Sequence, residues 1–222
     1  MDAPLLQIKD VKKYFPVKKV RGGEDIAVKA VDSIDLTINS GEIVGLVGES
    51  GCGKSTLGKS ILKLYDITEG QILFHGEDIT NYTEKQMHPL REKIQIIFQD
   101  PYASLNPKKK IVQSVMAPLN ATKKYTKEEK LQKVIAILNE VGLDEKYLEK
   151  YPHEMSGGQR QRVVIARALI NDPELVVCDE PVSALDVSVR SQVLNLLKDL
   201  QKSRNLTYIF ISHDLSVVEY LC

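Results

Sequence analysis

A glycine-rich run between residues 48 and 56 has the composition and spacing of a phosphate-binding loop. Glycines let a backbone wrap closely around an anion, so that successive N–H groups point inward at it. Lys54 can reach the β- and γ-phosphates of a nucleotide, and the Ser55 hydroxyl is placed to bind Mg²⁺. The residues expected to contact the phosphates are Gly48, Glu49, Ser50, Gly51, Cys52, Gly53, Lys54, Ser55 and Thr56.

The residues on either side of this loop predict the two elements that must position it. Glu42–Val47 is apolar enough for a buried strand, and apolar residues recur at helical spacing from Ser55 to about Tyr65. A chance glycine turn, which is the alternative interpretation, does not account for this strand–loop–helix order. The helix would also direct the positive end of its dipole at the phosphates.

Polar side chains follow three further predicted strands. Asp179 and Glu180 end the apolar run that begins at Leu175, His213 follows the run 207–212, and Gln99 follows the run 94–98. Because ligands lie at the carboxyl ends of the strands in an open parallel sheet, we expect these four side chains to meet near the phosphate loop. Taken singly, each has a simpler interpretation as a strand-end cap or a surface residue.

These positions predict a division of roles in phosphoryl transfer to water. Asp179 would hold Mg²⁺ through water, and the amide oxygen of Gln99 would be a further ligand beside Ser55. Glu180 would orient and polarise the attacking water, and His213 would bond that water or the γ-phosphate. The predicted catalytic residues are therefore Lys54, Glu180 and His213.

A second possible anion site lies at Ser156-Gly157-Gly158-Gln159, which opens a predicted helix. One chain seldom needs two such sites for one triphosphate. A dimer does need them if each subunit supplies this helix start to the nucleotide held by the other. The alternative is an ordinary helix N-cap preceded by a flexible hinge.

The bulk composition limits the class of protein. The chain has 222 residues, and its 30 Lys and Arg residues balance its 30 Asp and Glu residues, which argues against a general nucleic-acid footprint. Its cysteines, Cys52, Cys178 and Cys222, match no metal or redox spacing, so a reducing cytosolic compartment is expected. No apolar run approaches the ~20 residues that span a bilayer, so any membrane association is expected to come through a partner.

The order of elements predicts an α/β fold with a mostly parallel sheet. The first stretch is β-rich, with strands expected at Leu5–Tyr14 and Ala27–Asn39 and a hairpin tip at residues 21–23. The pattern becomes helical from Asp100 to Ile170 and then returns to strand–helix–strand. We therefore expect one nucleotide-binding domain, residues 1–222, with a core at 1–99 and 171–222 and a helical insertion at 100–170.

In combination and in order, these motifs resemble the ATP-binding subunits of ABC transporters. The resemblance implies a P-loop NTPase core of the RecA-like type with an N-terminal antiparallel β subdomain and an inserted helical subdomain. It also implies that two such domains close head to tail around two ATP molecules. Ser156 and Gly158, with Gly157 and Gln159, would then contact the partner's ATP, Asp186 would lie at the dimer interface, and Tyr14 would stack on adenine, with Phe15 as a weaker alternative.

Within that family the sequence most resembles the ATPases of oligopeptide and dipeptide importers. Of the two ATPases that such importers often contain, it is more similar to the second. The resemblance rests on segments 13–17, 98–107, 151–154 and 182–190. The resemblance implies a second ATPase subunit (a heterodimer, or a homodimer in isolation), two permease subunits, and indirectly an extracytoplasmic peptide-binding protein. It places the chain at the cytoplasmic face of the cell membrane.

Family members continue well beyond the histidine, so the chain is expected to lack the C-terminal part of the family domain. An ATPase that powers the import of nickel or another solute is an alternative, because the ATPases of nickel importers share much of the sequence in these segments. An ABC ATPase that acts on DNA or ribosomes is a less favoured alternative, since the chain has neither a long coiled-coil insertion nor a second fused ATPase unit. A small-molecule kinase or a GTPase would not explain Ser156–Gln159.

Overall fold

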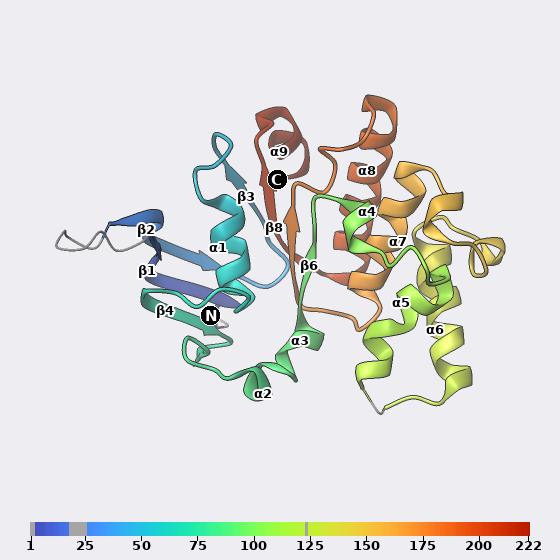
Figure 1. The fold of residues 1–222 in the computed structure, drawn as a ribbon, viewed down its shortest axis with the longest axis horizontal. Coiled ribbons are helices and arrows are strands. Elements are labelled where there is room, and N and C mark those ends of the chain that lie inside the picture. Colours follow the sequence, from blue (N-terminus) through green and yellow to red (C-terminus); the bar gives the residue numbers. More distant parts are fainter. Residues whose placement is uncertain (1–2, 18–25, 123) are drawn as a thin grey trace.

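The computed structural model describes residues 3–17, 26–122 and 124–222. The predicted hairpin tip at residues 21–23 therefore lies outside the described residues. The described residues form two four-stranded sheets, one antiparallel and one parallel, with helices packed against them (Figure 1). No helix among the described residues is both long and apolar enough to cross a membrane.

The antiparallel sheet is built mainly from the first part of the chain. Its strands run in the order β2-β1-β4-β5, with β1 paired to both β2 and β4. The bounds are β1 Leu6–Pro16, β2 Ala27–Ile38, β4 Glu69–Phe74 and β5 Glu77–Asp78. Both long strands of the first stretch are thus present, within two residues of their predicted limits.

The parallel sheet brings together strands that are far apart in sequence. Its order is β3-β8-β7-β6, with β3 Ile43–Val47, β8 Thr207–Ser212, β7 Leu175–Asp179 and β6 Ile94–Ile97. Val47 pairs with Ser212, and Asp179 pairs with Ile211. The carboxyl ends of these strands therefore lie at one edge of the sheet, where the sequence predicts the ligand.

Alternation along the central strands separates two hydrophobic cores. Leu175 and Val177 of β7 pack in the core that contains α1, while Val176 and Cys178 pack in the core that contains α7. Residues on a strand point to opposite faces in turn, so one buried strand serves both cores. In Figure 1 the parallel sheet accordingly lies between the antiparallel sheet with α1 on one side and α4–α7 on the other.

The helices follow the predicted helical stretches. They are α1 Lys54–Ile61, α2 Glu84–Met87, α3 Leu90–Lys93, α4 Pro101–Ser104, α5 Ile111–Ala121, α6 Lys127–Glu140, α7 Gly157–Leu169, α8 Val187–Arg204 and α9 Leu215–Leu221, with 3₁₀ turns at Glu145–Tyr147 and Pro152–Glu154. The chain between β6 and β7 thus contains helices and 3₁₀ turns, as its composition predicts.

Local sequence signals explain where several helices begin and end. The predicted capping box of α6 is present, because Thr126 Oγ1 accepts from the Glu129 N–H and the Glu129 carboxylate accepts from the Thr126 N–H. Helix α1 ends at Ile61, four residues before the predicted limit near Tyr65. The reason is Lys63, which takes a left-handed conformation (φ 54°) and donates its ammonium to Asp66 and to the Thr80 carbonyl.

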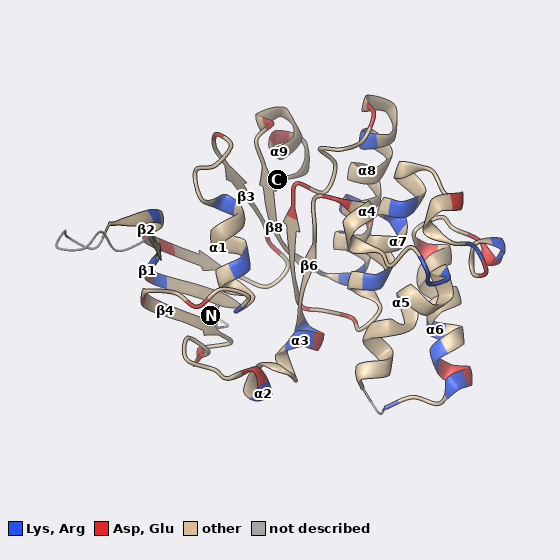
Figure 2. Ribbon diagram, in the orientation of Figure 1, with Lys and Arg blue, Asp and Glu red and all other residues tan. Residues whose placement is uncertain are grey.

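Basic and acidic residues are interspersed along the described chain rather than separated into a basic and an acidic part (Figure 2). Both kinds lie on each side of the parallel sheet. One cluster has a clear structural role and lies beside a cavity of about 670 Å³ between α8 and the segment that connects α7 to β7.

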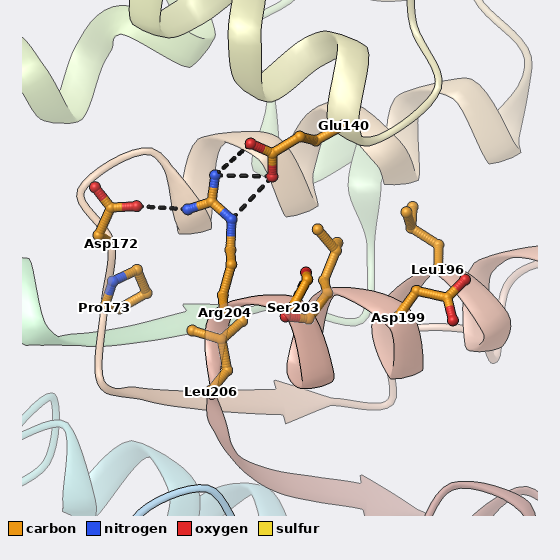
Figure 3. Close-up of a pocket in the computed structure, with 9 residues that line it drawn as sticks. Glu140, Asp172, Pro173, Leu196, Asp199, Ser203, Arg204 and Leu206 are labelled. Carbon is orange, nitrogen blue, oxygen red and sulfur yellow. Dashed lines mark hydrogen bonds and ion pairs between the residues drawn. The ribbon is translucent and has the colours of Figure 1, made fainter.

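Arg204, the last residue of α8, ties the helical stretch to the core (Figure 3). Its Nε and Nη2 donate to both oxygens of Glu140 at 2.9 and 2.8 Å, and its Nη1 pairs with Asp172. Glu140 ends α6, and Asp172 lies where the chain returns from α7 to β7. A rigid guanidinium that holds two carboxylates from different segments fixes their relative positions more strongly than an isolated surface pair.

We expect the Arg204→Gln substitution to lower the free energy of unfolding by about 1–2 kcal/mol, because two carboxylates lose their shared partner. Lys202→Gln is the matched control, since it removes the same charge from the same last turn of α8. Urea unfolding at low and high salt provides the measurement. Equal losses for the two variants would show that the helix dipole, and not this ion pair, carries the effect.

Candidate nucleotide-binding and catalytic site

Nine of the predicted site residues, from four separate segments, line one pocket at the carboxyl edge of the parallel sheet. The pocket has a volume of about 430 Å³. It is lined by Ser50, Gly51, Gly53, Lys54, Ser55, Thr56, Gln99, Glu180 and His213. The pairing of β3, β8 and β7 produces this meeting, because it brings the residues after each strand to the same edge.

The glycine-rich turn between β3 and α1 depends on two left-handed residues, Gly51 (φ 84°) and Gly53 (φ 100°). Their surroundings differ. A Cβ at Gly53 would lie 1.8 Å from the Ala30 carbonyl oxygen, whereas one at Gly51 would meet nothing within 4 Å. The loop therefore rests directly on β2, a contact that the motif alone does not reveal. Gly53 is also the N-cap of α1, so this contact sets the position of the helix start.

Lys54 and Ser55 connect the loop to the rest of the site. The Lys54 ammonium donates to the carbonyl oxygens of Gly48 and Glu49, both at 2.7 Å, and so lies within the curve of the loop. The Ser55 hydroxyl donates to Asp179 Oδ1 at 2.6 Å. This hydrogen bond joins the first turn of α1 to the end of β7, two elements whose residues are 124 positions apart.

The donor atoms fit a magnesium ion. Ser55, Asp179 and Gln99 offer hydroxyl, carboxylate and amide oxygens, which are the ligand types that Mg²⁺ prefers. The described residues contain no group of three or more His, Cys, Asp or Glu side chains that could hold a metal by themselves. The three oxygen donors of Ser55, Asp179 and Gln99 leave room for the water and substrate phosphates that usually complete the shell of Mg²⁺.

Glu180 is held in position by contacts on several sides. Its backbone is left-handed (φ 48°), a conformation that costs a bulky residue about 1–3 kcal/mol and that surrounding contacts must maintain. Its N–H donates to the Ile211 carbonyl at 3.1 Å. Its Oε2 accepts from Gln99 Nε2 at 3.3 Å and lies 3.1 Å from His213 Nδ1. Gln99, Glu180 and His213 thus form one hydrogen-bonded group in the pocket.

Asp179 and Glu180 face different partners, although they are adjacent. Asp179 contacts Ser55 at the phosphate loop, whereas Glu180 contacts Gln99 and His213. The Glu180 side chain is 15% exposed, while that of His213 is 56% exposed and open to the pocket. A shielded carboxylate can accept a proton from water. Here the water would lie between the Glu180–His213 pair and a bound phosphate.

Tyr14 lies outside the pockets that adjoin the loop. A second cavity, of about 490 Å³, includes Cys52, Lys54 and Asp32 in its lining but not Tyr14. The Tyr14 hydroxyl donates to Asp32, and this hydrogen bond raises the pKa of Tyr14. Phe15 instead makes an edge contact with Tyr65. The stacking of Tyr14 on adenine therefore stays a prediction, with Asp32 as the residue that connects it to the cavity.

The residues predicted to serve a partner's nucleotide do not line the pocket of their own chain. Ser156 caps α7 by accepting from the Gln159 N–H at 3.3 Å, and the Gln159 side chain donates to the Tyr147 hydroxyl at 3.0 Å. Gly158 lies so close to α8 that a Cβ would be 2.4 Å from Val189 Cγ1. Asp186, the N-cap of α8, is exposed and makes no side-chain capping bond.

Tyr147 is a supporting residue that the sequence pattern did not indicate. It lies in a short 3₁₀ turn that has no helical period, so nothing in its spacing connects it with Gln159. In the folded chain this turn packs near the start of α7, where the Tyr147 hydroxyl accepts a hydrogen bond from the Gln159 amide and holds it in place.

Comparison with known proteins places this arrangement in a family. Residues 31–183 match the family described as ABC transporter. The chain is 52% identical to the oligopeptide transport ATP-binding protein AppF of Bacillus subtilis, over 98% of the chain and 67% of the relative. It is 48% identical to the dipeptide transport ATP-binding protein DppF of Escherichia coli, over 100% of the chain and 66% of the relative. The chain thus spans about two thirds of the length of these curated relatives.

Solved structures have the same fold. The dimeric ATP-binding cassette MJ0796, in a post-hydrolysis state bound to ADP and Pi, superposes with a TM-score of 0.84 at 30% identity, covering 97% of this chain and 90% of that one. The protein cbiO1 from Clostridium perfringens, part of the ABC transporter complex cbiONQ, gives a TM-score of 0.83 at 30% identity, covering 99% of this chain and 82% of that one.

The different surroundings of the two loop glycines predict different costs of substitution. Gly51→Ala should lower the free energy of unfolding by about 1 kcal/mol, from the left-handed conformation alone. Gly53→Ala should cost more than about 3 kcal/mol, because the new Cβ must also displace the backbone at Ala30. Urea unfolding without nucleotide measures both. Equal costs would mean that the contact between the loop and β2 does not constrain Gly53.

Proposed function

The chain belongs to the ABC transporter family, and on this premise we propose that it is the ATP-hydrolysing subunit of an importer of oligopeptides or dipeptides. The observation that carries the proposal is the pocket in which the phosphate loop, Gln99, Glu180 and His213 meet. It contains a phosphate cradle and a carboxylate–imidazole pair on one sheet edge, which is what hydrolysis of a nucleoside triphosphate requires.

The substrate class is supported by the relatives. Oligopeptide transport ATP-binding proteins of Bacillus subtilis are 52% and 50% identical to this chain, and the dipeptide transport ATP-binding protein of Escherichia coli is 48% identical. The first two matches extend over 98% and 100% of the chain, so they include the segments outside the general ATPase motifs.

In the proposed reaction, the loop N–H groups and Lys54 bind the β- and γ-phosphates and stabilise the charge that develops as the γ-phosphoryl group leaves. Glu180 orients the attacking water and accepts its proton. His213 donates to the γ-phosphate or to that water and holds the Glu180 carboxylate in place. When bound, Mg²⁺ would be held by Ser55, Asp179 and Gln99 and would neutralise charge on the phosphate oxygens.

The second half of each site is proposed to come from another ATPase subunit. Ser156 and Asp186, the N-caps of α7 and α8, are exposed and do not line their own chain's pocket, which supports a contact with a neighbouring subunit. The N–H groups at the start of α7 would bind the γ-phosphate that the neighbour's loop holds. ATP then stabilises the closed pair through its higher affinity for that state, and hydrolysis releases it.

The proposal includes the rest of an importer. The partners are a second ATPase subunit of the same family, two permease subunits, and an extracytoplasmic peptide-binding protein that delivers the peptide. As the ATPase subunit of such an importer, the chain would be peripheral at the cytoplasmic face and held there by the permeases.

Replacing Glu180 with Gln should reduce ATP turnover by at least a hundredfold while leaving ATP binding intact, because the amide keeps the shape of the side chain but cannot accept a proton. Because the ATP is not hydrolysed, a nucleotide-bound dimer should accumulate, and size-exclusion chromatography would detect it. Glu128→Gln, at an exposed position on α6, is the control. Turnover within a few-fold of the unsubstituted protein would remove Glu180 from its role.

The transport function is tested by identifying what co-purifies with the tagged full-length protein from its native membranes. We expect a second related ATPase, two permeases and a peptide-binding protein. Uptake of labelled di- and oligopeptides by the reconstituted complex should require ATP. Recovery of nucleic-acid-binding factors without a permease would contradict the importer and leave the ATPase chemistry in place.

A further inference from the structure

The 3₁₀ turn Glu145–Tyr147 presents one phenol to the start of α7. The Tyr147 hydroxyl accepts a hydrogen bond from Gln159 Nε2 at 3.0 Å, and within the described part of the chain it has no other hydrogen-bond partner. Gln159 is the third residue of α7. The phenol therefore acts on residues 156–159, the group proposed to reach a neighbouring subunit's nucleotide.

The two ends of the Gln159 amide have different partners. Its Oε1 accepts from the Ser156 N–H at 3.0 Å, while its Nε2 donates to Tyr147. The Gln159 N–H in turn donates to Ser156 Oγ at 3.3 Å. Because the Ser156 hydroxyl is an acceptor in this bond, its own hydrogen can be donated to a phosphate oxygen. The position of the Gln159 amide therefore influences the direction in which Ser156 presents its donors.

The phenol itself is held firmly. The ammonium groups of Lys146 and Lys150 lie 5.3 and 4.7 Å from the centroid of the Tyr147 ring. The backbone after the ring is fastened to α5, because the carbonyls of Leu148 and Lys150 accept from the first two N–H groups of that helix at 3.0 and 2.9 Å. A ring fixed in this way restrains the amide that bonds to it.

The hydroxyl can be removed without disturbing the chain's own ATP pocket or a hydrophobic core. Neither Tyr147 nor Gln159 lines that pocket. The Tyr147 ring is partly buried against the core that contains α7, and a phenylalanine would keep this packing. A change at this hydroxyl should therefore act on residues 156–159 and leave the phosphate loop of the same chain unaffected.

We propose that Tyr147 is a positioning residue for the ATP site of the neighbouring subunit. This inference rests on the proposed ATPase dimer. The hydroxyl fixes the Gln159 amide, and the amide fixes the Ser156 N–H, so the donors at the start of α7 are ordered before the neighbour's nucleotide arrives. Ordering these groups in advance lowers the entropic cost of binding the γ-phosphate that the neighbour's loop holds.

The test measures ATP affinity for Tyr147→Phe in two assembled transporters made from full-length subunits. In the first, Lys54→Ala disables this chain's loop, so ATP is held by the loop of the neighbouring ATPase. In the second, the corresponding lysine of the neighbouring ATPase is replaced instead. Tyr147→Phe should weaken ATP binding about fivefold in the first transporter, as expected for the loss of one hydrogen bond, and should leave the second unchanged.

Tyr151→Phe is the matched control. Its ring stacks on His153 with centroids 5.6 Å apart, and its hydroxyl has no hydrogen-bond partner among the residues that the structure describes. This variant should leave ATP affinity unchanged in both transporters. Gln159→Ala should weaken binding in the Lys54→Ala transporter, and adding Tyr147→Phe should weaken it no further, because the hydroxyl acts through that amide.

Three results would overturn the role of Tyr147: unchanged affinity in the Lys54→Ala transporter, equal weakening in both transporters, or an equal effect of Tyr151→Phe. Each can occur in a transporter whose unsubstituted form hydrolyses ATP and imports peptides, and the proposed function would then stand. An unsubstituted transporter that does not hydrolyse ATP would overturn the proposed function and the role of Tyr147 together.

Discussion

The parallel pairing of β3, β8 and β7 is the constraint on which the rest of this structure depends. It aligns Val47, Ser212 and Asp179 at one edge, so the phosphate loop, His213 and the two carboxylates follow from neighbouring strand ends. The hydrogen bond from Ser55 to Asp179 then joins the start of α1 to the end of β7. The two cores on opposite faces of the sheet hold this edge rigid, because each buried strand contributes alternate side chains to both.

The sequence predicted the features that local periodicity and local hydrogen bonding determine. The strand–loop–helix around the phosphate loop, the helical stretch between β6 and β7, and the capping box at Thr126 all arise from residues close in sequence. The meeting of Gln99, Glu180 and His213 could also be predicted, because the carboxyl ends of parallel strands must share an edge.

Features that depend on contacts between distant segments could not be predicted in this way. Three features are of this kind: the left-handed backbone of Glu180, the contact of the Gly53 turn with Ala30, and the hydrogen bond from Gln159 to Tyr147. The spacing of these residues in the sequence shows no pattern from which the features could be predicted. Helix α1 ends early at Ile61 because the Lys63 ammonium bonds Asp66 and the Thr80 carbonyl. The position of Thr80 relative to Lys63 depends on the tertiary structure and could not be predicted from the local sequence. Ser156 and Asp186 do not line the pocket of their own chain, which supports a second subunit whose nucleotide they contact.

We propose that each ATP site is completed by two polypeptides, and the most direct test is to identify which polypeptide touches the γ-phosphate. In the assembled transporter, Lys54→Ala disables the loop of this chain, so ATP that stays bound is held by the loop of the other ATPase subunit. Photolysis of an ATP analogue with a reactive group on the γ-phosphate should then label the peptide of this chain that contains residues 156–159. Label found only on the other ATPase subunit would contradict the account.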